Sequence, residues 1–280
     1  MNEGKLGYVS LFSSAGVGCY GFSQEGFDCI VTSELIQRRL DVQKANKVCS
    51  LDSGYIGGDF TLKRTRDKVV DAIANWKNTY NNKEVDVLIA TPPCQGISVA
   101  NHKKNNELKR NSLVVESLSL IHQIMPRYFI LENVRGFLNT TCTDIDGVDR
   151  KIAEAINLNL AGQYNIAHRI INFKDFGNNS SRTRTVVIGV RKDIEDITPY
   201  ELFPTEKKAP TLRELIGDLK PLNKMGEIDE KDIYHNFRNY DSKMLEWIKD
   251  INEGESAFDN TDPAKRPHKI IDGVIIPNVN

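Results

Sequence analysis

A cysteine and a glutamate lie at the ends of two apolar runs, where they could perform nucleophilic and acid chemistry. Cys94 follows the run Val85–Ala90, which the Pro92-Pro93 pair ends abruptly. Glu132 ends the run Tyr128–Leu131. Open α/β sheets bind ligands at the carboxyl ends of their parallel strands. We therefore expect the Cys94 thiol, as a nucleophile, to lie near the Glu132 carboxyl, which could hold and donate a proton. Taken alone, each residue also fits a simpler reading, Cys94 as a small buried apolar side chain and Glu132 as a cap of the next segment.

Two arginines and a polar segment add positive charge near this pair. Arg182 and Arg184 precede the run Thr185–Val190, and side chains two residues apart on an extended chain point the same way. They could hold a carbonyl, a carboxylate or a phosphate, or they could simply be solvated. The polar segment Gln95–Asn111, with its lysines, predicts either a lid that touches phosphates or an ordinary basic loop.

A glycine-rich turn follows the first apolar run of the chain. Gly16, Gly18 and Gly21 match the pattern GxGxxG, which permits a tight turn close to a nucleotide, although such turns also occur without ligands. Glu34 ends the second run, where an acidic residue can accept a hydrogen bond from a ribose hydroxyl. Asp59, after Gly58, could accept from an adenine amino group or could belong to a simple turn.

Alternating strands and helices must position these residues. The sequence predicts strands at residues 8–12, 29–33, 85–90, 128–131, 164–173 and 185–190. It predicts helices at residues 17–25, 35–45, 64–80, 112–124 and 148–161. This alternation predicts an α/β fold, a mostly parallel Rossmann-like sheet with helices on both faces.

The pattern changes after about Asp193. Seven of the ten prolines fall in the remaining 87 residues, and apolar periodicity weakens there. We therefore expect a catalytic and cofactor-binding domain at residues 1–193 and a smaller, irregular domain at residues 194–280.

Composition excludes several classes of protein. The chain is 40% hydrophobic and 27% charged with a net charge of −1, which indicates a soluble domain without a global basic field. No apolar run reaches the about 20 residues of a membrane span, and the N-terminus lacks a signal-peptide pattern. Five scattered cysteines without a CxxC pair predict a cytoplasmic protein with neither disulfides nor a metal site.

The order of these motifs resembles that of the cytosine-5 DNA methyltransferase family. Phe-x-x-x-Gly-x-Gly from Phe12, Glu34, Gly-Asp-Phe, Pro-Pro-Cys-Gln, Glu-Asn-Val and Arg-x-Arg follow one another over residues 6–192. Pro-Pro-Cys-Gln, with Glu-Asn-Val about forty residues later, is the specific part of the resemblance, and the glycine motif supports it. A looser likeness extends over residues 210–219.

The resemblance implies a cofactor and a role for each motif residue. The cofactor would be S-adenosyl-L-methionine, and the residues implied to bind it are Phe12, Gly16, Gly18, Glu34, Asp59, Phe60 and Pro92. Glu34 would bind the ribose, and Asp59 with Phe60 the adenine. Cys94 would be the nucleophile, Glu132 would contact the target cytosine, and Arg182 and Arg184 would orient Glu132 and the base.

The implied reaction is methyl transfer to C5 of a cytosine flipped out of double-stranded DNA, in a bacterial or phage restriction-modification system. A thiolate that adds to C6 makes C5 nucleophilic, and the irregular domain would recognise the target sequence.

Two departures from the family pattern appear. Ser180 stands where the family usually has glutamine before Arg-x-Arg. The last two family motifs have no counterpart before Asn280, so we expect a second chain or a further C-terminal segment to complete the fold.

Three alternatives remain open from the sequence. The same chemistry could act on tRNA, or the chain could be a catalytically silent subunit that binds DNA or cofactor. A dinucleotide oxidoreductase would explain Gly16, Gly18 and Glu34 but not the Cys94 and Glu132 motifs.

Overall fold

The computed structural model describes residues 6–81, 84–93 and 107–278, and the chain forms two compact units, residues 1–211 and 212–280. The division lies later than the predicted boundary at residue 193, because the segment 194–211 packs with the first unit. Phe203 is buried there against Ala167 and Ile188.

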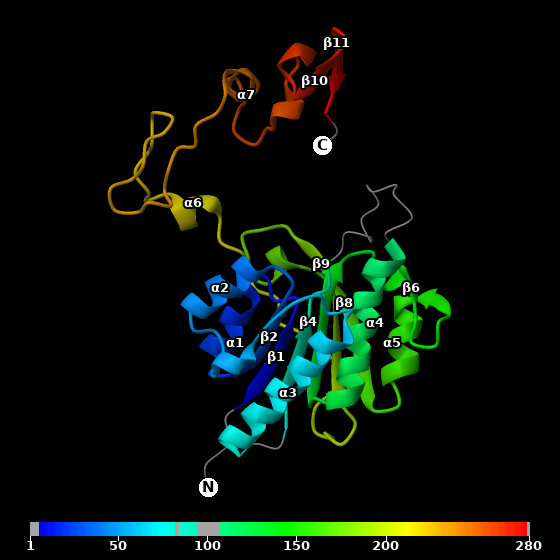
Figure 1. Cartoon of the computed structure of the whole chain (residues 1–280). Coiled ribbons are helices and arrows are strands. Elements are labelled where there is room, and N and C mark those ends of the chain that lie inside the picture. Colours follow the sequence, from blue (N-terminus) through cyan, green and yellow to red (C-terminus); the bar gives the residue numbers. More distant parts are fainter. Residues whose placement is uncertain (1–5, 82–83, 94–106, 279–280) are drawn as a thin grey trace. The chain divides into compact units, whose positions relative to one another are not determined.

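A seven-stranded sheet forms the centre of the first unit (Figure 1). The strand order is β3-β2-β1-β4-β5-β9-β8, and the bounds are β1 Gly7–Leu11, β2 Asp28–Glu34, β3 Tyr55–Gly57, β4 Val87–Ala90, β5 Tyr128–Val134, β8 Tyr164–Asn172 and β9 Thr183–Arg191. The first five strands of this order pair in parallel, and β9 pairs antiparallel with both β5 and β8. The predicted mostly parallel α/β sheet is confirmed.

Helices cover both faces of the sheet. Their bounds are η1 Val17–Cys19, α1 Tyr20–Gln24, α2 Gln37–Ala45, α3 Lys63–Tyr80, α4 Glu107–Ile124 and α5 Ile152–Leu160. Adjacent residues of β1 point to opposite faces: Tyr8 stacks on Phe22 of α1, whereas Val9 belongs to the core under α3, α4 and α5. All five residues of β1 are buried, as expected for a central strand covered on both sides.

One helix is shorter than its periodicity predicts. The pattern over residues 148–161 predicts a single helix, but α5 begins only at Ile152 and a hairpin precedes it, β6 Thr141–Thr143 with β7 Asp149–Lys151. Gly147 turns this hairpin at a positive φ of 80°, and Arg150 pairs with Asp144 and Asp146 across it. These local bonds favour the turn over helix between residues 144 and 150.

The second unit is small and irregular. It contains α6 Leu212–Ile216, α7 Ser242–Ile248 and a hairpin of β10 His268–Ile271 with β11 Val274–Pro277. Asp241 caps α7 by accepting a hydrogen bond from the backbone N–H of Met244 at 2.8 Å. The role of this second unit in recognising a target sequence stays a prediction.

Within the described residues, no helix is long and apolar enough to cross a membrane. The same residues contain no group of three or more His, Cys, Asp or Glu side chains arranged to hold a metal ion.

Substitution of Gly189 by alanine should destabilise the first unit. Gly189 lies in β9 directly opposite Phe129 of β5, and a Cβ there would overlap the buried Phe129 ring. We expect a loss of about 1–3 kcal/mol in the free energy of unfolding, measured by urea denaturation. Gly162→Ala is the matched control, because a Cβ there meets open space. Equal stability of the two variants would contradict this packing.

Candidate active site

A single cavity at the carboxyl edge of the sheet collects most of the predicted site residues. It has a volume of ≈490 Å³, and its lining includes Phe12, Glu34, Asp59, Phe60, Pro92, Glu132, Arg182 and Arg184. These residues come from the ends of β1, β2, β4 and β5, from the segment after β3, and from the start of β9. The parallel strands thus bring the residues predicted to bind ligands together at one edge of the sheet.

The chain turns sharply at the end of β1. Phe12 and Ser14 have positive φ angles of 59° and 50°, a region that residues with a Cβ rarely adopt. The Phe12 ring packs edge-on against Phe60, with ring centroids 5.5 Å apart. Two aromatic rings therefore line one part of the cavity, and the strained turn is typical of a functional site.

Glu34 fixes this turn with its carboxylate. Oε2 accepts a hydrogen bond from the Ser14 backbone N–H at 2.8 Å, and Oε1 accepts from the Ile36 N–H at 3.0 Å. Arg39 forms an ion pair with Oε1 at 3.3 Å. Glu34 is buried, yet it lines the cavity, and its three contacts fix the orientation of both carboxylate oxygens.

Gln43 of α2 supports the same turn and was not predicted. Its Nε2 donates to Ser13 Oγ at 2.9 Å and to the Ser14 carbonyl oxygen at 2.7 Å. Gln43 is fully buried within α2. A polar residue on the inner side of a predicted helix is the signal that could have revealed it.

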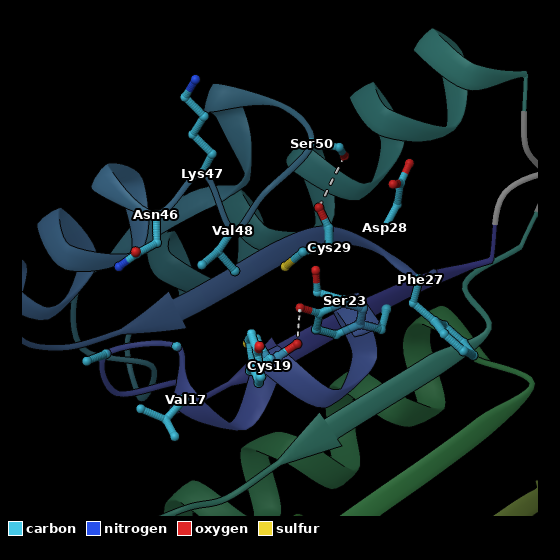
Figure 2. Close-up of a pocket in the computed structure, with 14 residues that line it drawn as sticks. Val17, Cys19, Ser23, Phe27, Asp28, Cys29, Asn46, Lys47, Val48 and Ser50 are labelled. Atoms are coloured by element: carbon cyan, nitrogen blue, oxygen red, sulfur yellow. Dashed lines mark hydrogen bonds between the residues drawn. The ribbon is translucent and has the colours of Figure 1, made fainter. Parts of the chain in front are cut away.

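The glycines that follow this turn do not line the first cavity. Gly16 adopts a left-handed φ of 86° at the start of η1, where a Cβ would crowd Gln43. Gly16 lines a second cavity (Figure 2) rather than the first, and Gly18 lines neither. Their predicted contact with a cofactor stays a prediction.

Asp59 and Phe60 face the cavity after β3. Asp59 Oδ1 accepts hydrogen bonds from the backbone N–H and the hydroxyl of Thr61, at 2.9 and 2.8 Å. These bonds use only Oδ1, so Oδ2 can accept a further bond from a ligand amino group. Arg66 of α3 donates to the carbonyl oxygens of Phe60 and Thr61, at 3.0 and 2.7 Å, and fixes this segment.

Glu132 and Arg184 form an ion pair inside the cavity. Arg184 Nε lies 2.9 Å from Glu132 Oε1, and these side chains are 15% and 25% exposed, respectively. The antiparallel register, with Val134 opposite Arg184, brings them together. Burial raises the pKa of the Glu132 carboxyl above its ordinary value, while Arg184 and Arg182 act in the opposite direction. Glu132 therefore keeps its proton to a higher pH than a fully exposed glutamate does.

Asn133 ties this strand to the turn that leads to Cys94. Its Nδ2 donates to the Pro92 carbonyl oxygen at 2.9 Å, and its Oδ1 accepts from the Val134 N–H at 2.9 Å. Pro92 and Pro93 both line the cavity. Cys94 lies outside the described residues, as does most of the predicted lid; the last part of that segment, from Glu107, belongs to α4.

The comparison with known families decides the identity of this fold. The profile described as C-5 cytosine-specific DNA methylase matches residues 6–271. The chain belongs to this family. The resemblance inferred from the motif order is thereby confirmed.

Relatives in the family cover most of this chain. The Type II methyltransferase M1.HgaI of Avibacterium volantium is 32% identical over 90% of the chain and 67% of the relative. The Type II methyltransferase M1.HphI of Haemophilus parahaemolyticus is 29% identical over 91% of the chain and 63% of the relative. The chain thus spans about two thirds of the length of these methylases.

Solved structures support the same fold. A prophage-encoded DNA modification methyltransferase of E. coli superposes with a TM-score of 0.58 at 22% identity, over 81% of this chain and 58% of that one. A Spodoptera frugiperda DNMT2 variant gives a TM-score of 0.52 at 19% identity, over 81% of this chain and 62% of that one. The cavity of this methylase chain lies at the carboxyl edge of that shared fold.

Replacing Asn133 should impair any reaction that depends on Cys94. Asn133→Ala removes both hydrogen bonds, and Asn133→Asp keeps only the bond from Val134. Because a misplacement of about 1 Å can cost about 100-fold in rate, we expect both variants to lower kcat by about 10- to 100-fold with little change in cofactor affinity.

Asn159→Ala is the matched control for this prediction, since Asn159 also donates two hydrogen bonds, to Asp144 and Ala155, but does not line the cavity. An unchanged kcat in both Asn133 variants would show that this contact does not position the turn.

Proposed function

We propose that this chain transfers a methyl group from S-adenosyl-L-methionine to C5 of cytosine in double-stranded DNA. The observation that carries the proposal is the Glu132–Arg184 ion pair, which lies in the same cavity as Glu34 and the Pro92-Pro93 turn. The Glu132 carboxyl, with its raised pKa, lines the same cavity as the Pro92-Pro93 turn, and this turn leads directly to Cys94. Such an arrangement suits a reaction that needs an acid and a thiolate together.

The residues of the cavity fit S-adenosylmethionine. Glu34 presents a fixed carboxylate for ribose hydroxyls, Phe12 and Phe60 offer apolar surface for adenine, and Asp59 Oδ2 can accept from the adenine amino group. When bound, the cofactor supplies an electrophilic methyl group. The fit rests on the donor and acceptor groups of this cavity.

The thiolate of Cys94 adds to C6 of the cytosine, and electron density moves to C5. Glu132 donates a proton or hydrogen bond to N3 and stabilises this adduct, while Arg184 holds the Glu132 carboxyl in position. Arg182, which also lines the cavity, adds positive charge near O2 of the base. After C5 takes the methyl group, C5 loses its proton to a base and the Cys94–C6 bond breaks, which restores the thiolate.

The substrate base must leave the duplex to reach this cavity. In a stacked cytosine the neighbouring bases cover the ring faces from which C6 and C5 are attacked. In this proposal the second unit reads the target sequence, and the chain acts in a restriction-modification system in the cytoplasm.

Covalent capture on a modified duplex tests the proposal. DNA with 5-fluorocytosine at candidate targets blocks loss of the C5 substituent, so the protein should stay bound to the base in the presence of S-adenosylmethionine. Tryptic digestion should place the adduct on residues 84–103, the peptide that contains Cys94.

Two comparisons make the capture decisive. Unmodified duplex is the control and should give no stable adduct, and a fluorocytosine-substituted tRNA tests the alternative substrate. Capture on tRNA alone would move the activity to RNA. Absence of any adduct, despite cofactor binding, would favour a catalytically silent subunit.

A further inference from the structure

An arginine stands near the start of α3, at a place where the helix itself does not favour it. The N-cap of α3 is Leu62, which has no polar side chain to cap the helix, and the first turn contains no acidic residue. Arg66 lies one turn into α3, where the positive end of the helix dipole disfavours a cation. The stability of α3 alone therefore does not account for Arg66.

Arg66 reaches back to the segment that lines the first cavity. Its Nη1 donates to the carbonyl oxygens of Phe60 and Thr61, at 3.0 and 2.7 Å. Thr61 in turn donates its N–H and its hydroxyl to Asp59 Oδ1. Thr61 is thus held by Arg66 at its carbonyl oxygen and holds Asp59 with its donors. The orientation of the Asp59 carboxylate therefore depends on Arg66.

Glu116 of α4 completes this arrangement. Its Oε2 lies 3.0 Å from Arg66 Nη1, and the Arg66 and Glu116 side chains are 23% and 25% exposed. Burial raises the pKa of Glu116, whereas the charge of Arg66 lowers it. A largely buried guanidinium that met only carbonyl oxygens would lack a neutralising charge, which Glu116 supplies. The ion pair therefore keeps Arg66 turned toward Phe60 and Thr61.

The pair links two helices that cover the same face of the sheet (Figure 1). Leu113 lies three residues before Glu116, on the same side of α4, and it lines the first cavity. Neither Arg66 nor Glu116 lines that cavity. These two residues can therefore influence a ligand there only through the residues that they hold in place.

We propose that the Arg66–Glu116 pair positions the segment from Asp59 to Thr61 for adenine, and thereby gives the first cavity its selectivity for a purine that carries an amino group. This inference rests on the proposed function, in which S-adenosylmethionine occupies the cavity. Asp59 Oδ2 accepts from the amino group, and the buried Phe60 ring, packed against Phe12, supplies apolar surface. Both contacts require that the segment stays where Arg66 holds it.

Two ligands that differ at one group of the purine test the proposal by calorimetric titration. S-Adenosylhomocysteine carries the amino group of adenine, and S-inosylhomocysteine carries a carbonyl oxygen in its place. The Asp59 carboxylate can accept a hydrogen bond from the amino group but repels the carbonyl oxygen. Wild-type protein should therefore bind the adenosyl compound at least about tenfold more tightly than the inosyl compound.

Substitution of either member of the pair should reduce this selectivity. Arg66→Gln should lower the affinity ratio of the two ligands to less than about threefold and weaken binding of S-adenosylhomocysteine by about tenfold. Glu116→Gln removes the charge but keeps the shape, so it should change both values in the same direction. The double variant should bind no more weakly than Arg66→Gln, because both residues act through one contact.

Kinetics should show the same division between binding and chemistry. In Arg66→Gln the KM for S-adenosylmethionine should rise by about tenfold, while kcat at saturating cofactor should stay within about twofold of the wild-type value. Arg66→Lys keeps the positive charge beside Glu116 and can still donate to a carbonyl oxygen. Its ligand selectivity should therefore lie between those of the wild type and Arg66→Gln.

Arg127→Gln is the matched control. Arg127 pairs with Asp86 at the same distance of 3.0 Å, and neither residue lines the first cavity. This variant should keep the wild-type ratio of affinities. A ratio that falls as far in Arg127→Gln as in Arg66→Gln would reflect a general effect of losing an ion pair and would overturn the proposal.

Hydrogen exchange of the ligand-free protein reports on the segment without any cofactor. The N–H groups of Thr61 and Leu62, both bonded to Asp59, should exchange at least about fivefold faster in Arg66→Gln and Glu116→Gln. Unchanged exchange would overturn the proposal, and so would faster exchange with an unchanged affinity ratio, since the pair would then be structural only. If wild-type protein binds neither ligand, the proposed cofactor fails and the role in adenine selectivity fails with it. If wild-type protein binds and transfers methyl groups but the variants keep its selectivity, this inference alone fails.

Discussion

Glu132→Gln should lower the rate of methyl transfer to duplex DNA by about 10²- to 10⁴-fold, the range that proton transfer by a positioned side chain contributes. Glutamine has nearly the shape of glutamic acid and can still donate a hydrogen bond, but it cannot release a proton to N3. The loss should appear in kcat, measured by transfer of tritiated methyl groups at saturating cofactor and DNA.

The pH dependence of the same reaction tests the protonation state of Glu132. Activity requires the protonated carboxyl, so kcat should fall as pH rises through its pKa. Burial raises that pKa, and Arg184 and Arg182 lower it. Arg184→Gln removes a lowering charge, so its alkaline limb should move to higher pH even though its maximal rate falls. A limb that moves to lower pH would contradict the assignment.

The fold should survive Glu132→Gln. Because the pKa of Glu132 is raised in the folded protein, ionised Glu132 costs stability above the pKa that it has in the unfolded chain. A neutral side chain of the same shape removes this cost, so the Tm at neutral pH should not fall. A Glu132→Gln protein with wild-type kcat and Tm would remove Glu132 from the mechanism.

The sequence predicts the sheet and its reactive edge because both depend on local patterns. The runs at residues 85–90 and 128–131 are apolar and short, and each ends at a polar motif. Their parallel pairing as β4 and β5 then places Pro92 and Glu132 at one cavity. Two kinds of information are sufficient for this inference: short apolar runs that alternate with helical segments, and the rule that open parallel sheets bind ligands at the carboxyl ends of their strands.

Contacts between distant elements could not be predicted in the same way. Gln43 reaches Ser13 across thirty residues, and Asn133 reaches Pro92 across forty-one. Each contact depends on how helices and strands are placed relative to one another, which periodicity does not encode. The antiparallel insertion of β9 between β5 and β8 is a similar case, and it alone brings Arg184 to Glu132.

The glycine motif shows that one local pattern can have two causes. Its spacing predicts that Gly16 and Gly18 lie against a nucleotide, and this contact stays a prediction, because Gly16 lines the second cavity and Gly18 neither. The left-handed φ of Gly16 explains the residue type there, since it lets the chain turn beside Gln43. Glycine is favoured both where the backbone needs a left-handed φ and where a ligand approaches the backbone closely. The sequence motif looks the same in both cases.

Cys94→Ala should have the largest effect of any substitution in the chain, a loss of methyl transfer of about 10⁴-fold or more. Loss of a catalytic nucleophile typically costs this much, because the remaining groups stabilise an adduct that no longer forms. Without the thiolate, C5 of cytosine stays a poor nucleophile toward the methyl group. The measurement is again tritiated methyl transfer, together with loss of the covalent fluorocytosine adduct.

The outcome for Cys94→Ala must be separated from a general loss of the site. The Pro92-Pro93 turn and its bond from Asn133 do not involve the thiol, so the variant should keep wild-type affinity for S-adenosylmethionine. Cys49→Ala is the matched control, because it removes a buried thiol that does not line the reactive cavity, and it should retain kcat. If Cys94→Ala retained kcat while Glu132→Gln lost it, the cavity would still hold an acid, but the nucleophile would have to be a different group.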